Sequence, residues 1–267
     1  NKIMKLGFIG AGNMAKAMIG GILKNNIFKP EEVIASDLYE PGLRQAKESL
    51  GIHVTTDNKE VARTAEVLVL SVKPQFYDAV IKEIKELITE TQIIVTIAPG
   101  KTLEYLAGAF EKPVKLVRTM PNTPALVGEG ITGVCRNDLV TKEELDYICN
   151  ILSGFGMAQV LSENLMDVVV SVSGSSPAYV FMLIEAMADG AVADGMPRQQ
   201  AYQFAAQAVL GSAKMVLETG KHPGELKDMV CSPAGTTIEA VRVLEAKGFR
   251  SSVIEAMKAC VKKAKGL

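Results

Sequence analysis

The chain has 267 residues, of which 48% are hydrophobic, and 29 basic against 30 acidic residues give a formal net charge of −1. This length allows two domains or one large one, and the balanced charge excludes the positive field that attracts nucleic acid or an anionic membrane. The cysteines are widely spaced and form no CxxC pair, so neither a zinc site nor a disulfide framework is predicted. Since no apolar leader precedes the first predicted strand, we expect a cytoplasmic protein.

The first half of the chain alternates short apolar strands with helices. Strands are predicted at Lys5–Ile9, Val33–Asp37, Val67–Val72, Ile93–Ile97 and Val114–Thr119. Helices are predicted at Met14–Lys24, Pro41–Leu50, Asn58–Ala62, Tyr77–Leu87 and Leu103–Phe110. Two further strands, Ile131–Cys135 and Ala158–Leu161, flank a helix at Lys142–Phe155. This alternation predicts an α/β fold with a doubly wound, mostly parallel sheet of Rossmann type, covered on both faces.

After Ser162 the strand pattern stops. Helices are predicted at Leu165–Val172, Pro177–Asp194, Arg198–Thr219, Gly224–Met229, Thr237–Ala246 and Ser251–Lys265. We therefore predict a dinucleotide-binding domain over residues 1–162 and an all-α domain over residues 163–267. The helix from Pro177 is apolar or small on almost every side and has to be buried, so we expect a second subunit to cover it. Glu185 and Asp189 interrupt the helix and argue against a membrane span.

A glycine motif, GAGNMA, joins the first predicted strand to the first helix. It consists of Gly10, Ala11, Gly12, Asn13, Met14 and Ala15. This is the G-x-G-x-x-G/A pattern of dinucleotide binding in its required context of strand before and helix after. Gly10 allows the tight turn, Gly12 lets a pyrophosphate approach the backbone, and Ala15 lets the helix pack closely. The exposed N–H groups of the first helical turn then face negative charge. A purely structural turn is the alternative.

Asp37 ends the second predicted strand, where an acidic residue bonds the ribose 2′-hydroxyl of NAD and repels a 2′-phosphate. The neighbouring Ser36 is an alternative, because one step of register decides which of the two side chains faces the ribose. An aspartate at a strand end is also a common turn residue. The choice between NADH and NADPH stays open, with NADH slightly favoured.

Two more loops follow strand ends, where open α/β sheets bind ligands. The first, residues 71–74, contains Ser71, Lys73 and Pro74. Lys73 is a candidate cation for phosphate or substrate, with an ordinary exposed lysine as the alternative, and Pro74 rigidifies the turn. The second loop, residues 120–124, holds Asn122 between two prolines. Its amide is a candidate for orienting nicotinamide or substrate, or else it caps its own backbone.

The helical half contains two loops of small polar residues. Residues 173–177, SGSSP, open the long apolar helix and have the composition of a helix cap, although they can also bond a ligand. Residues 231–237, CSPAGTT, precede a later helix. There the N–H groups of Gly235, Thr236 and Thr237 and the positive end of the helix form a carboxylate cradle, with a capped loop as the alternative. Neither histidine has a triad-like or metal-like setting, so no metal site is predicted. Hydride transfer to an imine is compatible with this, because the nitrogen takes its proton before reduction, whereas a ketone needs a positioned acid.

Five segments together resemble the pyrroline-5-carboxylate reductases over essentially the whole chain. They are FIGAGNMA at 8–15, SVKPQ at 71–75, RTMPNTP at 118–124, SGSSPAY at 173–179 and SPAGTT at 232–237. The resemblance implies reduction of 1-pyrroline-5-carboxylate to L-proline by NADPH or NADH, the last step of proline biosynthesis. It also implies a helical dimerisation domain, with dimers often gathered into decamers, and a substrate site built from both chains.

The resemblance also implies roles for individual residues. The N–H groups of Gly235, Thr236 and Thr237 would hold the substrate carboxylate, and the Thr237 hydroxyl would contact the ring nitrogen as the catalytic group. Further substrate contacts would come from Ser232 and Ser175. The cofactor would be lined by Gly10, Gly12, Asn13, Met14, Ala15, Ser36, Asp37, Ser71, Lys73, Pro74 and Asn122.

The chain departs from the family pattern at two positions, because family members often have glycine at the place of Ser176 and often lack an acid matching Asp37. The second departure leaves the cofactor preference in doubt. Two alternatives for the function remain. A 3-hydroxyacid dehydrogenase of related build needs a K-x-x-N-N motif, which the sequence lacks. A catalytically silent dinucleotide-binding scaffold would bind cofactor without turnover, and the intact SPAGTT loop argues against it.

Overall fold

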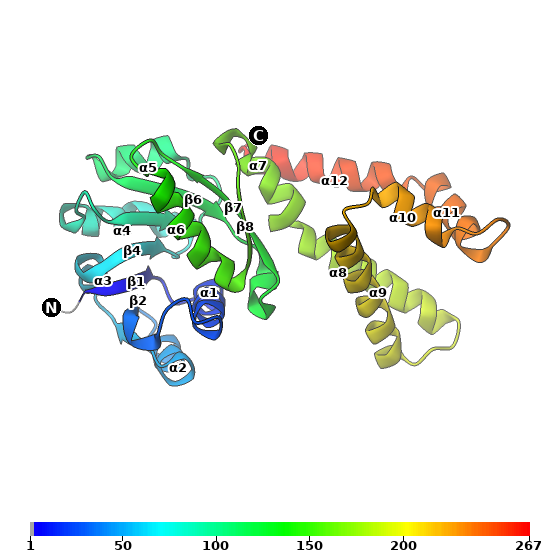
Figure 1. Cartoon of the computed structure of the whole chain (residues 1–267), viewed down its shortest axis with the longest axis horizontal. Helices are drawn as coiled ribbons and strands as arrows, with labels where there is room; N and C mark the ends of the chain where they lie inside the picture. The colour runs from blue at the N-terminus through cyan, green and yellow to red at the C-terminus, as the bar shows by residue number, and fades with distance from the viewer. Residues whose placement is uncertain (1–2) are drawn as a thin grey trace. The chain divides into compact units, whose positions relative to one another are not determined.

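The computed structural model describes residues 3–267, which divide into two compact units. The first unit runs to Gly174 and includes Val261–Leu267 at the end of the chain, and the second is Ser175–Cys260 (Figure 1). The domain boundary predicted after Ser162 stays a prediction. Each unit is described by itself below.

The first unit is built on an eight-stranded sheet with the order β3-β2-β1-β4-β5-β6-β7-β8. The strands are β1 Met4–Ile9, β2 Val33–Ser36, β3 His53–Thr55, β4 Ala65–Leu70, β5 Ile93–Thr96, β6 Lys115–Met120, β7 Gly130–Arg136 and β8 Gly156–Val160. Every neighbouring pair is parallel except β6 and β7. The predicted mostly parallel sheet is confirmed, but the short edge strand β3 is missing from the prediction.

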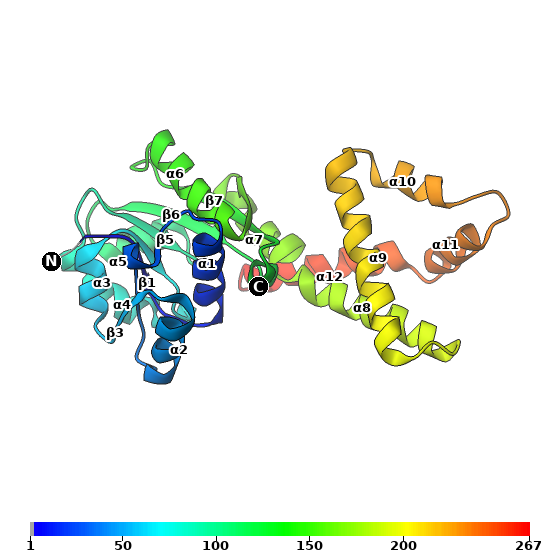
Figure 2. The ribbon, with the colours of Figure 1, turned by 60° about the horizontal axis from the view of Figure 1, so that its bottom comes forward.

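Helices cover both faces of this sheet (Figure 2). They are α1 Asn13–Lys24, α2 Glu40–Leu50, α3 Asn58–Thr64, α4 Tyr77–Ile84, α5 Leu103–Phe110 and α6 Lys142–Leu152. Side chains of α1, α2 and α6 pack into one core and those of α3, α4 and α5 into the other. Neighbouring residues of a strand serve opposite faces, so Phe8 belongs to the first core and Ile9 to the second. The arrangement is therefore doubly wound, with β1 in the middle of the sheet.

The predicted helix Leu165–Val172 is composite. A short 3₁₀ turn at Glu163–Leu165 leads into α7, Met166–Val169, and the chain then continues as a π-helix over Val170–Gly174. This π-helix runs directly into α8, Ser176–Ala193. π-helical turns inside α-helices are frequent at functional sites. The first compact unit ends at this irregular turn.

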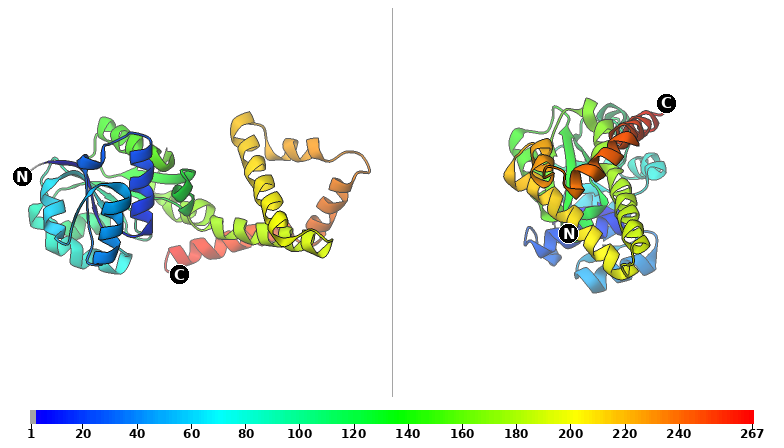
Figure 3. Two further views of the ribbon diagram at one scale, coloured as in Figure 1. Left: turned by 90° about the horizontal axis from the view of Figure 1, so that it is seen from below. Right: turned by 90° about the vertical axis from the view of Figure 1, so that its right-hand side faces the viewer.

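The second unit consists of helices (Figure 3). These helices bury few of their own apolar side chains. They are α8, α9 Arg198–Thr219, α10 Pro223–Val230, α11 Thr236–Ala246 and most of α12 Phe249–Ala264. The alanines Ala188, Ala201 and Ala205 are buried where α8 and α9 pack together. By contrast, Phe181 is 60% exposed and Phe204 is 65% exposed. Exposed apolar surface on this scale indicates a surface that another molecule covers.

One continuous helical run, Glu163–Ala193, is long and apolar enough to cross a membrane. Only 11% of its most apolar window is buried within the chain. Helices that pack in a soluble core or at a subunit interface pass the same test of length and composition. Within residues 3–267 it is the only such helix.

Candidate active site

The glycine motif forms a tight turn between β1 and α1. Gly10 adopts φ +107°, and its N–H donates to the carbonyl of Ser36 at 2.8 Å. A Cβ atom at this position would lie 2.8 Å from the backbone of both Ser71 and Val72. Positive φ and close backbone approach each require glycine at position 10. The turn therefore joins the carboxyl ends of three neighbouring strands, β1, β2 and β4.

The start of α1 is open to a ligand. Gly12 is the N-cap residue, and no atom lies within 4 Å of the place where its Cβ would be. The first intrahelical bond here runs from the N–H of Lys16 to the carbonyl of Gly12, so the N–H groups of residues 13–15 have no helical partner. Ala15 is buried in the core and lets α1 pack on the sheet. Free N–H groups, an open approach at Gly12 and the positive helix end fit a pyrophosphate.

The structure decides between Ser36 and Asp37. Ser36 is fully buried, and its hydroxyl donates to Oδ1 of Asn58 at 2.8 Å, so the prediction that it lines the cofactor is corrected to a supporting role beneath the strand end. Asp37 is partly exposed, and its Oδ2 accepts from the N–H of Ala11 at 2.8 Å. Its Oδ1 accepts from the N–H of Tyr39 at 3.0 Å. The Asp37 carboxylate thus lies against the glycine motif.

The loop after β4 contacts the glycine motif through Ser71. The Ser71 hydroxyl is 2.6 Å from the carbonyl oxygen of Gly10, to which it donates, and 3.1 Å from that of Ile9. Ser71 therefore braces the turn from the neighbouring strand. Lys73 and Pro74 are exposed where the next 3₁₀ turn begins, and their predicted cofactor contacts stay predictions.

Asn122 has a role that neither sequence interpretation included. Its Oδ1 accepts from the N–H of Ile131 at 2.9 Å, and its Nδ2 donates to the carbonyl of Ser173 at 3.1 Å. The residue is 9% exposed, and both atoms of its amide bond to the protein. Asn122 does not cap its own backbone with its side chain, so that alternative is corrected. The amide instead holds the loop after β6 against β7 and the π-helix. Its predicted contact with the cofactor stays a prediction.

Arg118, in the same segment, forms a contact that sequence reasoning did not predict. Its Nη1 lies 3.0 Å from Oε2 of Glu163, and the same oxygen accepts from the N–H of Leu103 at 2.8 Å. Arg118 is 5% exposed. Burial, together with the Glu163 carboxylate, raises the pKa of the neighbouring Cys135 thiol to about 11. This group of residues ties β6 and α5 to the 3₁₀ turn at Glu163–Leu165. The only feature of the sequence that pointed to this contact is the position of Arg118 in the RTMPNTP segment.

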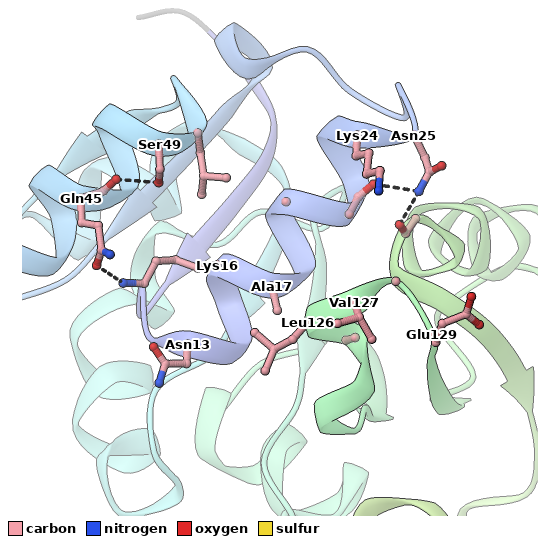
Figure 4. Close-up of a pocket in the computed structure, with 16 residues that line it drawn as sticks. Asn13, Lys16, Ala17, Lys24, Asn25, Gln45, Ser49, Leu126, Val127 and Glu129 are labelled. Atoms are coloured by element: carbon pink, nitrogen blue, oxygen red, sulfur yellow. Dashed lines mark hydrogen bonds between the residues drawn. The ribbon is translucent and has the colours of Figure 1, made fainter. Parts of the chain in front are cut away.

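The first unit carries a groove of about 830 Å³ along α1. Figure 4 shows its wall, with Lys16 bonded to Gln45 of α2 and with Leu126 and Val127 on the turn between β6 and β7. Of the predicted site residues, Asn13 alone lines it. The groove therefore begins beside the glycine motif but runs along the outer face of α1, away from the other predicted cofactor residues.

In the second unit, the SPAGTT loop forms a tight turn before α11. The N–H of Gly235 donates to the carbonyl of Ser232 at 3.1 Å, and Ala234 adopts φ +57°. Pro233 followed by a residue with positive φ is the pattern of a type II turn. A Cβ atom at position 235 would lie 2.4 Å from the Ser232 hydroxyl oxygen, so a larger residue there would require the Ser232 side chain to move. The Gly235 N–H is used by the turn, which corrects its predicted part in the carboxylate cradle.

The start of α11 retains two of the three predicted cradle groups. The helix begins at Thr236, one residue before the predicted start, with Gly235 as an N-cap residue that makes no side-chain bond. The N–H groups of Thr236 and Thr237 belong to its first turn and have no intrahelical partner. Together with the helix dipole they fit a carboxylate.

Ser175 does not cap α8 with its side chain as predicted. It makes no side-chain cap bond, because the helical path continues into α8 from the π-helix. Instead, its Oγ accepts a hydrogen bond from the Cys260 thiol of α12 at 3.4 Å. The predicted contact of Ser175 with substrate stays a prediction.

Comparison with known proteins identifies the family. A family model described as "Pyrroline-5-carboxylate reductase dimerisation" matches residues 163–267, and one described as "NADP oxidoreductase coenzyme F420-dependent" matches residues 5–100. Pyrroline-5-carboxylate reductase of Escherichia coli (strain K12) is 52% identical over 263 residues, which cover 98% of each chain. The chain belongs to the pyrroline-5-carboxylate reductase family.

Solved structures of pyrroline-5-carboxylate reductases share the whole fold. The reductase from Coxiella burnetii superposes with a TM-score of 0.93 at 34% identity, covering 99% of this chain and 98% of that one. The Plasmodium falciparum reductase with NADP bound gives a TM-score of 0.89 at 31% identity, covering 98% and 97%. The chain is thus an oxidoreductase with an N-terminal NAD(P)-binding domain.

Membership of the reductase family also accounts for the exposed apolar helices of the second unit. Residues 163–267 match a dimerisation domain, so the chain associates with a second copy of itself. The expectation that a second subunit covers the helix from Pro177 rested on the apolar and small residues that occupy almost every side of it.

Proposed function

We propose that the chain reduces 1-pyrroline-5-carboxylate to L-proline with NADPH or NADH, the last step of proline biosynthesis. The ring nitrogen takes a proton from solvent, and hydride from the nicotinamide then adds to the adjacent carbon. The electron pair of the C=N bond moves onto nitrogen and leaves a neutral secondary amine, so no positioned acid is needed at the moment of transfer. The observation that carries this proposal is the pair of free N–H groups at the start of α11, which fits the carboxylate of an imino acid.

In this proposal the SPAGTT loop binds the substrate. The N–H groups of Thr236 and Thr237 hold its carboxylate, the Thr237 hydroxyl bonds the ring nitrogen, and Ser232 contributes a second hydroxyl. Thr237 is partly exposed at the first turn of α11. A hydroxyl that bonds the ring nitrogen would orient the ring while hydride approaches its face.

The glycine motif would hold the cofactor, with its pyrophosphate against the N–H groups of residues 13–15. The bound nicotinamide supplies hydride, and the protein supplies orientation. The hydrogen bond from the Ser71 hydroxyl to the Gly10 carbonyl would hold the motif in its conformation. Lys73 and Pro74 would lie alongside the cofactor at the end of β4.

For the assembly, we propose dimers, with a decamer built from five dimers as the larger form. We also propose a cytoplasmic location without nucleic-acid or membrane partners. The near-zero net charge supports the absence of nucleic-acid and anionic-membrane partners. The substrate site would then combine one nucleotide-binding domain with helices of both chains.

The proposal is tested by following NADH and NADPH oxidation with pyrroline-5-carboxylate as substrate. We expect turnover with pyrroline-5-carboxylate. We expect no reduction of NAD+ or NADP+ when 3-hydroxy acids are offered as substrates. Turnover on 3-hydroxy acids alone would establish the dehydrogenase alternative. Cofactor binding without turnover on any cyclic imine would establish the silent scaffold.

A further inference from the structure

We infer that Asp37 and Glu40 form an acidic edge that makes this chain select NADH against NADPH. The inference rests on the proposed cofactor site and deepens it by naming which nucleotide the site accepts. In this fold, the ribose that carries the 2′-phosphate of NADP lies at the carboxyl end of the second strand.

The position of Asp37 is determined by two hydrogen bonds rather than by the strand register alone. One carboxylate oxygen accepts from Ala11 of the glycine motif and the other from Tyr39, at 2.8 and 3.0 Å. Each oxygen keeps a second lone pair that can accept from a ribose hydroxyl. Asp37 thus presents a fixed negative charge beside the motif that would hold the pyrophosphate.

Glu40 adds a second negative charge at the same strand end. It is exposed in the first turn of α2, three residues after Asp37. A 2′-phosphate placed here would therefore face two carboxylates, whereas the uncharged 2′-hydroxyl of NADH would find an acceptor.

Within the described residues this edge is not part of an ion pair. None of the ion pairs found within residues 3–267 involves Asp37 or Glu40. Lys16 of α1 is hydrogen-bonded to Gln45, and Arg44 is exposed one turn further along α2. An NADPH-selective site needs a cation that pairs with the 2′-phosphate. Arg44 is an exposed cation of α2 that could do so, and the experiment therefore includes a variant of it.

The expected discrimination is substantial. In water, the repulsion between one carboxylate and a phosphate dianion several ångströms away corresponds to about tenfold in affinity. We therefore expect wild-type protein to bind NADH at least tenfold more tightly than NADPH. Because the effect is electrostatic at an exposed site, it should shrink as the salt concentration rises.

The test measures nucleotide dissociation constants of the full chain without substrate, by the change in nucleotide fluorescence and by calorimetry. Asp37→Asn keeps an acceptor for the Ala11 N–H but removes the charge, and Glu40→Gln does the same at the second position. Glu48→Gln is the matched control, since Glu48 is an exposed acid near the other end of α2. As isolated probes, 5′-AMP and 2′,5′-ADP differ only by the 2′-phosphate.

We expect Asp37→Asn and Asp37→Asn/Glu40→Gln to tighten NADPH and 2′,5′-ADP binding by tenfold or more, with 5′-AMP nearly unchanged and Glu48→Gln like wild type. Equal affinity of wild type for NADH and NADPH, or tight NADPH binding that Arg44→Ala abolishes, would overturn the inference and leave the reductase proposal standing. Failure of folded wild-type protein to bind either nucleotide would instead overturn the proposed function.

Discussion

The amide of Asn122 donates to the carbonyl of Ser173 at 3.1 Å and so fastens the loop after β6 to the π-helix at which the first compact unit ends. The other half of the same amide accepts from Ile131 of β7 at 2.9 Å. One nearly buried side chain therefore joins its own loop to β7, which is close in the sequence, and to the π-helix, which is 51 residues further along the chain. This explains why an asparagine between two prolines is structural here, although it lies at a strand end where ligands bind.

We predict that Asn122→Ala lowers the free energy of unfolding by about 1–3 kcal/mol, because a buried N–H and a buried carbonyl lose their partner. Urea unfolding of the purified chain measures this. Asn150→Ala, an exposed asparagine on α6, is the control and should change stability by less than about 0.5 kcal/mol. Equal stability of the two variants would show that the Asn122 bonds contribute nothing.

Thr237→Ala is predicted to reduce kcat/KM for pyrroline-5-carboxylate by at least about tenfold, because it removes the hydroxyl proposed to bond the ring nitrogen. Cofactor dissociation constants should stay near those of wild type, since Thr237 is assigned to the substrate. Steady-state kinetics and nucleotide titration measure the two quantities. Thr219→Ala, at the exposed end of α9, is the matched control. Unchanged kinetics would remove Thr237 from the site.

Ala234→Gly is predicted to stabilise the second unit by up to about 1 kcal/mol, because Ala234 adopts φ +57° and glycine has no Cβ to clash there. Ala234→Val should have the opposite sign. Thermal unfolding monitored by circular dichroism gives the comparison. A lower melting temperature for the glycine variant would mean that added freedom in the unfolded chain outweighs the relieved strain.

Phe204→Asp is predicted to weaken self-association, because it places a charge on an apolar side chain of α9 that is 65% exposed within one chain. Light scattering should show smaller particles than wild type at the same concentration. Leu139→Asp changes a 47% exposed leucine of the first unit and should leave the mass unaltered. Loss of mass only in the control would place the contact surface on the first unit instead.

Much of the nucleotide-binding unit follows from local sequence. The glycine motif, the strands and the helices were predictable because each depends on residues within one or two turns of each other: apolar periodicity, glycine at a sharp turn and caps at helix ends. The edge strand β3 has only three residues, none of them fully buried, so it left no such pattern.

The hydrogen-bond partners of the polar side chains could not be predicted from local sequence. Whether Ser36 or Asp37 faces the glycine motif depended on the register of β2 beside β1. The bonds from Asn122 to Ser173 and from Arg118 to Glu163 depended on segments more than 40 residues further along the chain. Whether the Gly235 N–H was free depended on the exact turn before α11. The sequence by itself determined most of the elements, the family and the two helix starts that are proposed to bind anions. Only the tertiary structure decided which polar groups remain available at them, because hydrogen-bond partners are chosen by proximity in space and each donor that the fold uses is lost to a ligand.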